Sequence, residues 1–115
     1  MKKILFDTLY QIGAYKIFKL GKCNTLTVLS LHRISNEIDF FWNPIKLESF
    51  ERLIKHLMQN YKIITFCEII DLPNKVSSKP YLILSFDDGY YDFIDIALPY
   101  LIKKGLPSNH NVVNE

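Results

Sequence analysis

The chain has 115 residues, of which 49% are hydrophobic and 23% are charged, and its formal net charge is +2. This length allows one domain with a modest core, and the ordinary hydrophobicity argues against a disordered chain. The small charge, with no run of Lys and Arg among aromatic residues, gives no reason to expect nucleic acid as a partner. Cys23 and Cys67 are too far apart for a metal-type pair, so we expect free thiols in a reducing compartment.

Residues 1–22 predict an amphipathic, basic N-terminal helix. Apolar residues recur at helical spacing, and five lysines make the segment basic: Lys2, Lys3, Lys16, Lys19 and Lys22. Polar residues interrupt the apolar run and no small-residue cleavage site follows, so we expect neither a cleavable signal peptide nor a membrane span. The helix either packs on the domain, which we favour, or makes peripheral contact with an anionic membrane. A cytoplasmic or membrane-peripheral protein is therefore expected.

The first half of the remaining chain predicts a strand, a helix and a second strand. Residues 25–31 alternate and are rich in β-branched types, which is typical of a strand, and residues 35–44 read as a loop. Apolar residues at helical spacing from Leu47 to Tyr61 predict a helix that faces the core. A short strand is expected at 62–64.

The second half continues the alternation. Thr65 and Glu68 form a capping-box pattern that opens a short helix through Ile70, and a surface connection is expected from 71 to 80. Residues 81–86 form an apolar run bounded by turn signals, which predicts a strand buried on both faces.

A third helix is expected over residues 93–104, followed by a strand at 108–113. The inward residues of this helix are predicted to be Ile94, Leu98, Leu101 and Ile102. Pro99 either kinks this helix or marks its first turn, and Gly105 is placed as its C-terminal cap. Strands alternating with helices predict an α/β fold with a parallel sheet and right-handed crossovers.

Two adjacent carboxylates and a glycine follow the strand at 81–86. Ligands and catalytic groups collect at the carboxyl ends of parallel strands, where Asp87 and Asp88 are expected to lie. Adjacent carboxylates repel each other unless a cation or proton holds them, and Gly89 allows the backbone to turn so that they can converge. The pattern favours metal-assisted chemistry with a general base over a helix-capping carboxylate beside a solvated turn residue.

The segment Ser85-Phe86-Asp87-Asp88-Gly89 closely resembles the first motif of the polysaccharide deacetylases, the NodB-homology domains of carbohydrate esterase family four. Leu31-His32-Arg33-Ile34 resembles an early strand of that family, and residues 47–64 and 97–107 resemble elements on either side of the motif. The resemblance implies that residues 23–115 are the N-terminal part of an irregular (β/α) barrel.

The resemblance also implies residue roles and a cofactor. Asp87 would be the general base and Asp88 a ligand of a divalent metal, zinc, in a hydrolase that removes acetyl groups from N-acetylated sugars. The family completes its metal site with two histidines of a later H-[ST]-x-x-H motif. Only His32, His56 and His110 occur here, and no two share a metal-ligand spacing, so the chain by itself is expected to be catalytically incomplete. His110 stands where the family usually has an apolar or aromatic residue.

Three further residues are candidates for substrate contact or for support of the site: His32, Trp42 and Tyr90. His32 follows a predicted strand, and a hydrogen-bonded histidine at a strand end is an equal alternative. Trp42 belongs to an aromatic run, residues 40–42, that either stacks on a sugar or caps the core, and we expect it to cap the core. Tyr90 directly follows the acidic motif.

Two other functions remain open. The chain is alternatively an inactive remnant or a glycan-binding or interaction module, which the missing histidines favour. It is otherwise an Asp-dependent phosphohydrolase, although that chemistry uses Asp-x-Asp and the carboxylates here are adjacent. A partial barrel also exposes unpaired strand edges, so we expect the piece to be marginally stable or prone to aggregate on its own.

Overall fold

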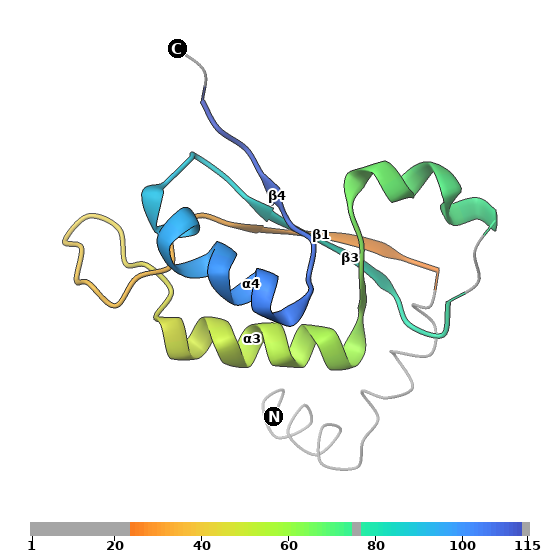
Figure 1. The fold of residues 1–115 in the computed structure, drawn as a ribbon, viewed down its shortest axis with the longest axis horizontal. Helices are drawn as coiled ribbons and strands as arrows, with labels where there is room; N and C mark the ends of the chain where they lie inside the picture. Colours follow the sequence, from red (N-terminus) through yellow and green to blue (C-terminus); the bar gives the residue numbers. More distant parts are fainter. Residues whose placement is uncertain (1–23, 75–76, 114–115) are drawn as a thin grey trace, which may run out of the picture.

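The computed structural model describes residues 24–74 and 77–113, and their centre is a parallel sheet (Figure 1). The central strand is β3 (Tyr81–Phe86), which pairs along its whole length with β1 (Leu26–Leu31). On its other side β3 pairs first with β2 (Lys62–Ile63) and, near its carboxyl end, with β4 (Asn109–His110).

The predicted α/β fold with a parallel sheet is confirmed, although the described residues form an open sheet and not a closed barrel. The helix predicted over 1–22, its membrane contact and Cys23 lie outside the described residues. No helix within the described ranges is long and apolar enough to span a bilayer.

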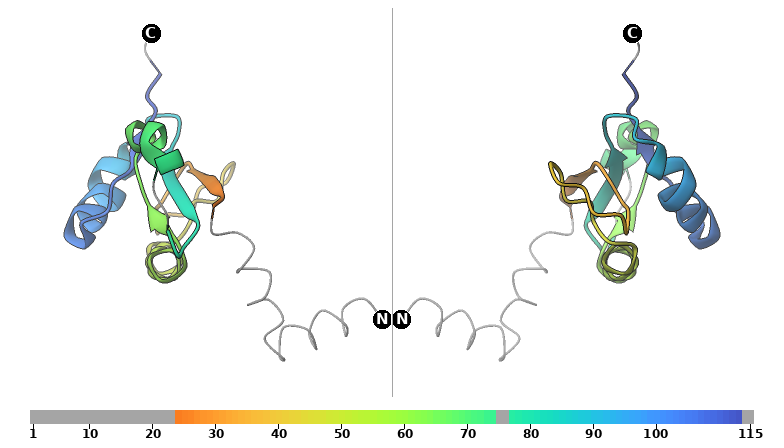
Figure 2. Two further views of the ribbon diagram at one scale, coloured as in Figure 1. Left: turned by 90° about the vertical axis from the view of Figure 1, so that its right-hand side faces the viewer. Right: turned by 90° about the vertical axis from the view of Figure 1, so that its left-hand side faces the viewer.

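Two helices cover one face of the sheet. They are α3 (Leu47–Asn60) and α4 (Leu98–Lys104), and Figure 2 shows both beside the strands. Phe50 and Ile54 of α3 pack with Leu84, Phe86 and their neighbours in the main core. Burial of such aliphatic and aromatic side chains contributes about 1.5–3 kcal/mol each. The apolar stripe predicted from residue 47 onward therefore does form the core-facing side of this helix.

The helix predicted over 93–104 begins differently from the expectation. Its first turn is a π-helix, η2 (Phe93–Ala97), and only then does α4 begin, with Pro99 in its first turn. A π turn holds one residue more than an α turn, so it rotates the faces of the helix. As a result, the prediction that Ile94 and Ile102 point inward is wrong, because their exposed fractions are 49% and 69%.

Gly105 ends α4 as predicted. It adopts a left-handed conformation with φ of 65°, and its N–H donates to the carbonyl of Ile102 at 2.9 Å. Glycine takes this conformation without the steric cost that a Cβ imposes.

Among the described residues, the helix that covers the opposite face of the sheet lies near the amino end of the strands. A 3₁₀ helix, η1 (Phe66–Asn74), packs Ile69 and Leu72 against Tyr81 and Ile83. Its start is the predicted capping box, in which the Glu68 carboxylate accepts from the Thr65 N–H at 2.8 Å. The helix was predicted to stop at residue 70 but continues for another turn, which shortens the surface connection.

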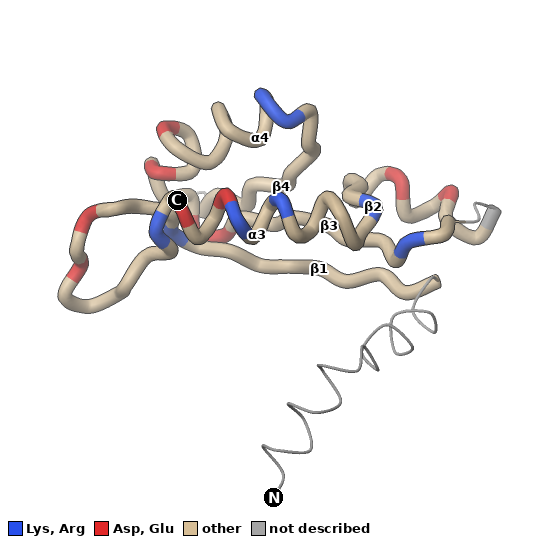
Figure 3. The backbone as a smooth tube through the Cα atoms, turned by 90° about the horizontal axis from the view of Figure 1, so that it is seen from below, with Lys and Arg blue, Asp and Glu red and all other residues tan. Residues whose placement is uncertain are grey.

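Beyond Ile83 this face changes from apolar to polar. The next side chains on it are Ser85 and Asp87, with Ser30 of β1 paired opposite Ser85 and Asn109 of β4 on the other side. The strand predicted over 108–113 is limited to the two residues of β4, because only these pair with β3. Figure 3 shows that acidic residues gather around this end of the sheet, in the loop after β1 and at the start of η2.

Candidate active site

The two carboxylates of the acidic motif lie at the carboxyl end of β3, as predicted. Asp87 is the residue after the strand, and its N–H still donates to the Leu31 carbonyl of β1 at 2.9 Å. Asp88 and Gly89 both have left-handed backbones, with φ of 70° and 64°. Two successive left-handed residues turn the chain sharply after the strand. The reversal takes Asp88 out of the strand alternation that would have placed it opposite Asp87.

The Asp87 carboxylate accepts hydrogen bonds from three side chains, which belong to β1, to β3 and to the residue that follows β4. One oxygen, Oδ2, accepts from the hydroxyl of Ser30, which comes from β1. The other, Oδ1, accepts from Asn111 Nδ2 at 2.6 Å and from Ser85 Oγ at 3.3 Å. Asn111 is itself held, since its Oδ1 accepts from Asn109 Nδ2 at 2.7 Å.

These donors stabilise the ionised form of Asp87. The hydrogen bond from Ser30, then those from Asn111 and Ser85, and the nearby His32 hold the pKa of Asp87 below the ordinary value of an aspartate, although partial burial opposes them. The carboxylate is therefore charged at neutral pH and fixed in direction, which are two requirements for a group that accepts a proton.

Asp88 and His32 face each other across the end of the sheet. His32 Nε2 lies 3.7 Å from Asp88 Oδ2, and the exposed fractions of the two side chains are 37% and 55%. The structure thus brings together Asp87, Asp88 and His32, which the sequence had singled out separately.

The aromatic run after β1 does not cap the core, so that prediction is wrong. Phe40 and Phe41 are 93% and 92% exposed, because the loop carrying them projects away from the sheet (Figure 1). Trp42 is 53% exposed, and its ring centroid lies 5.6 Å from that of His32. Of the three aromatic residues, Trp42 is the one placed beside the acidic motif.

Tyr90 directly follows the acidic motif and contacts Arg33. Its ring lies beneath the Arg33 guanidinium, 5.1 Å from the centroid, and borders a cavity of about 340 Å³. Glu37, Tyr91 and Asp95 also line this cavity. Tyr90 is therefore adjacent to the motif, and its ring contacts Arg33.

The other two histidines lie away from the motif. His56 is exposed on α3, next to Asn60. His110 packs into the core side of the sheet, where its ring stacks on Phe93 with centroids 4.0 Å apart. The His110 ring thus packs as an aromatic side chain, although its Nε2 has no hydrogen-bond partner among the described residues.

The described residues supply only part of a metal site. Asp88 and His32 are donors of types that zinc accepts, and they face each other. Catalytic zinc sites have three protein ligands, however, and no group of three or more His, Cys, Asp or Glu within residues 24–74 and 77–113 could hold an ion. A complete site would need ligands from elsewhere.

The donors around Asp87 were missed by sequence reasoning. Ser30 and Ser85 interrupt apolar strands, and Ser85 lies two residues before Asp87, on the same face. A serine within an otherwise apolar strand, on the same face as the aspartate that follows, could have indicated these donors. Asn111 could not be inferred, because its contact depends on the pairing of β4 with β3.

No family model matches the chain, and no curated protein matches it significantly in sequence. Solved structures do match. A de-N-acetylase from Aggregatibacter actinomycetemcomitans is 26% identical with a TM-score of 0.61, over 74% of this chain and 36% of that one. A polysaccharide deacetylase from Bacillus cereus is 30% identical with a TM-score of 0.56, over 68% of this chain and 24% of that one.

The deacetylase PplD from Streptococcus pyogenes, solved with acetate, shares the fold at 22% identity and a TM-score of 0.66, over 76% of this chain and 42% of that one. The chain spans between 24% and 42% of the length of these structures. The predicted resemblance to the polysaccharide deacetylases is therefore confirmed, and it concerns a minor part of each relative.

Proposed function

We propose that this chain is the N-terminal portion of a metal-dependent hydrolase that removes acetyl groups from the N-acetylated sugars of a polysaccharide or glycan. The observation that carries the proposal is the placement of Asp87, ionised and hydrogen-bonded, beside Asp88 at the carboxyl edge of a parallel sheet. The structural likeness to deacetylases supports the same function.

In this proposal Asp87 is the general base. Ser30, Ser85 and Asn111 direct its carboxylate, and it takes the proton from the water that attacks the acetamide carbonyl. The products are acetate and a free amine on the sugar. Closure of the sheet into an irregular (β/α) barrel belongs to the same proposal, because the chain covers only part of the related structures.

Asp88 is proposed as a ligand of a divalent metal, zinc, with the remaining ligands coming from outside the described residues. When bound, such a metal lowers the pKa of water and polarises a carbonyl. The carboxylates gathered at this end of the sheet give the site a negative potential that attracts cations (Figure 3). His32 is close enough to Asp88 to support that ligand or to contact the substrate.

Trp42 and Tyr90 are proposed as carbohydrate contacts at the rim, since aromatic faces present large apolar surfaces to a sugar ring. Trp42 is half exposed beside His32, and Tyr90 borders the cavity next to the motif. A cytoplasmic or membrane-peripheral location, with contact through residues 1–22, remains part of the proposal.

The test is acetate release from N-acetylglucosamine oligomers by the natural gene product, whose length is first fixed by intact mass and by sequencing past the codon for Glu115. Loss of a general base lowers the rate about 10²–10⁴-fold, so Asp87→Asn should abolish measurable release. Asp71→Asn is the matched control, because this carboxylate is exposed on η1, which packs at the amino end of the sheet, opposite to the motif. Equal rates for the two variants would refute the role of Asp87.

The second candidate is an inactive remnant or a glycan-binding module, and the incomplete ligand set favours it. A natural product that ends at Glu115, releases no acetate with zinc, and still binds an N-acetylglucosamine oligomer would establish it. Phosphatase activity lost in Asp87→Asn would instead support the phosphohydrolase.

A further inference from the structure

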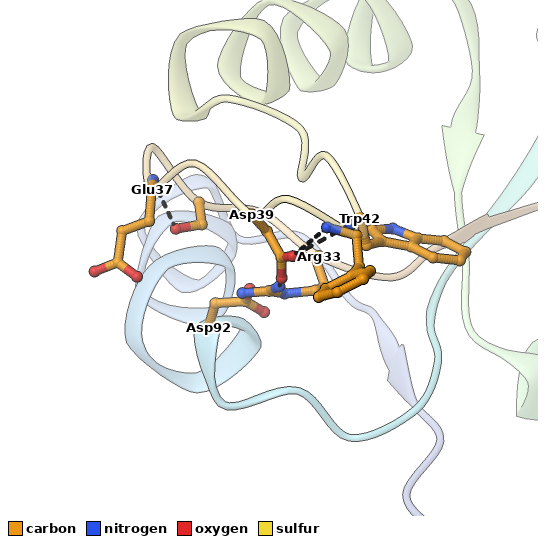
Figure 4. A network of polar contacts seen from close by, with 7 residues as sticks. Arg33, Glu37, Asp39, Trp42 and Asp92 are labelled. Carbon is orange, nitrogen blue, oxygen red and sulfur yellow. Dashed lines mark hydrogen bonds and ion pairs between the residues drawn. The ribbon is translucent and has the colours of Figure 1, made fainter.

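Arg33 connects three segments that meet beside the acidic motif. It follows His32 at the end of β1, and its side chain is 19% exposed. Its Nε donates to Asp92 Oδ2 at 3.2 Å, and its Nη1 donates to Asp39. The guanidinium also lies over the ring of Tyr90. Figure 4 shows Arg33 between the two carboxylates, one from the loop after β1 and one from the start of η2.

Asp39 links Arg33 to the aromatic loop, residues 40–42. While Oδ2 of Asp39 accepts from Arg33, Oδ1 accepts from the backbone N–H groups of Phe41 and Trp42, at 2.9 and 3.3 Å. One carboxylate therefore links Arg33 to the backbone of the residue whose ring packs on His32. Because Phe40 and Phe41 are exposed, they contribute little to holding this loop, and the polar contacts take that role.

Asp92 links Arg33 to the turn that carries Asp88. The Asp92 side chain is only 13% exposed, and its second oxygen has no hydrogen-bond partner among the described residues. Arg33 is thus the group that compensates this largely buried charge, and a buried carboxylate left without its partner is strongly unfavourable. Tyr90, stacked on Arg33, lies two residues after Asp88 and fixes the same turn.

We propose that Arg33 is a positioning residue that sets the approach of His32 to Asp88. From one side it keeps Trp42 against His32, and from the other it keeps the turn after Asp88 in place. A planar guanidinium can meet two carboxylates and one aromatic ring at once, which a lysine ammonium cannot do in the same geometry. The proposal deepens the proposed function, because it concerns residues of the same site.

The chain offers direct reporters of this arrangement. Trp42 is the single tryptophan, so fluorescence excited selectively at tryptophan, and not at the tyrosines, reports the aromatic loop. The ring protons of His32 lie near the Trp42 ring and should show a ring-current shift in NMR spectra, with assignment by His32→Gln. His56, exposed on α3, is the internal control.

The experiment compares acrylamide quenching of Trp42 and the His32 ring signals in the full chain and its variants. In Arg33→Met and in Asp39→Asn we expect quenching to rise by about twofold, because Trp42 moves from 53% exposed toward full exposure. The His32 signals should lose their ring-current shift in both variants. Arg33→Lys should behave like Arg33→Met.

Arg52→Met is the matched control, because Arg52 is an exposed arginine that pairs with Glu48 on α3. It should change neither readout. If Arg33→Met fails to fold, as judged by circular dichroism, Asp39→Asn tests the proposal instead. This variant weakens the Arg33–Asp39 contact and leaves the Arg33–Asp92 pair intact. Unchanged Trp42 and His32 signals in folded Asp39→Asn would overturn the proposal. No readout depends on acetate release, so this failure is separate from a failure of the proposed deacetylase activity.

Discussion

The two faces of β3 differ in what lies against them, although all six residues of the strand are buried. On one face Leu82, Leu84 and Phe86 pack under α3 and α4 in a continuous apolar core. On the other, Tyr81 and Ile83 pack under η1, and then Ser85 and Asp87 lead to a cluster of hydrogen-bonded polar groups. One strand thus separates a face that stabilises the fold from a face that places chemical groups at its carboxyl end.

The largest expected effect is on the helix side. Leu84 is 0% exposed, and Leu84→Ala should lower the free energy of unfolding by about 2–5 kcal/mol, measured by urea denaturation. Ile102→Ala on α4 is the control, since this residue is largely exposed and a surface change stays within about 0.5 kcal/mol. Comparable losses in the two variants would contradict the rotated helix face that follows from the π turn.

On the polar face the expected cost is smaller and has another cause. Ser85 is 4% exposed, and its hydroxyl donates to Asp87 and accepts from Asn111 at 3.1 Å. Ser85→Ala should cost about 1–3 kcal/mol, because it removes a partner from buried polar groups. Ser49→Ala, on the exposed side of α3, should change the same unfolding curve little. A stabilised Ser85→Ala variant would show that this cluster is not a satisfied network.

Two glycines test the turn at the site against an ordinary helix end. Gly105→Ala should cost about 1–2 kcal/mol, the penalty of a left-handed L-residue, since no atom lies within 4 Å of the added Cβ. Gly89→Ala should cost about the same, because its φ of 64° carries the same penalty and its Cβ would lie in ordinary van der Waals contact with Val112, at 3.4 Å. Thermal unfolding of both variants gives the comparison, and asparagine at each position should recover part of the loss.

The smallest effect is expected when the pH is lowered, and it concerns the loop that carries Trp42. The N–H groups of Phe41 and Trp42, and then Arg33, hold the pKa of Asp39 below its ordinary value. Because the pKa of Asp39 is lowered in the ordered loop, the stabilisation that its carboxylate gives the loop is complete above the ordinary aspartate pKa. This stabilisation is lost as the pH falls through the lowered value. Trp42 quenching should therefore stay flat from neutral pH into mild acid and rise only below that range. In Asp39→Asn this late rise should be absent.

Much of the fold could be predicted because it depends on local patterns. The apolar run at 81–86, the helical spacing after Leu47 and the glycine at 105 each specify their element through burial or backbone conformation. The phase of the helix after residue 93 could not be predicted, since a π turn and an α turn differ by one residue and the sequence carries no clear mark of the difference. Exposed aromatic residues at 40–42 likewise violate the rule that such side chains are buried.

By itself the sequence determined the α/β class, the acidic motif at the end of the strongest strand and the likeness to the deacetylases. Only the tertiary structure decided which groups surround Asp87, because Ser30 and Asn111 lie 57 and 24 residues away from it along the chain. The same holds for Arg33, whose two carboxylates come from different loops. Hydrogen bonds between distant segments depend on strand register and loop path, which a local pattern in one chain does not specify.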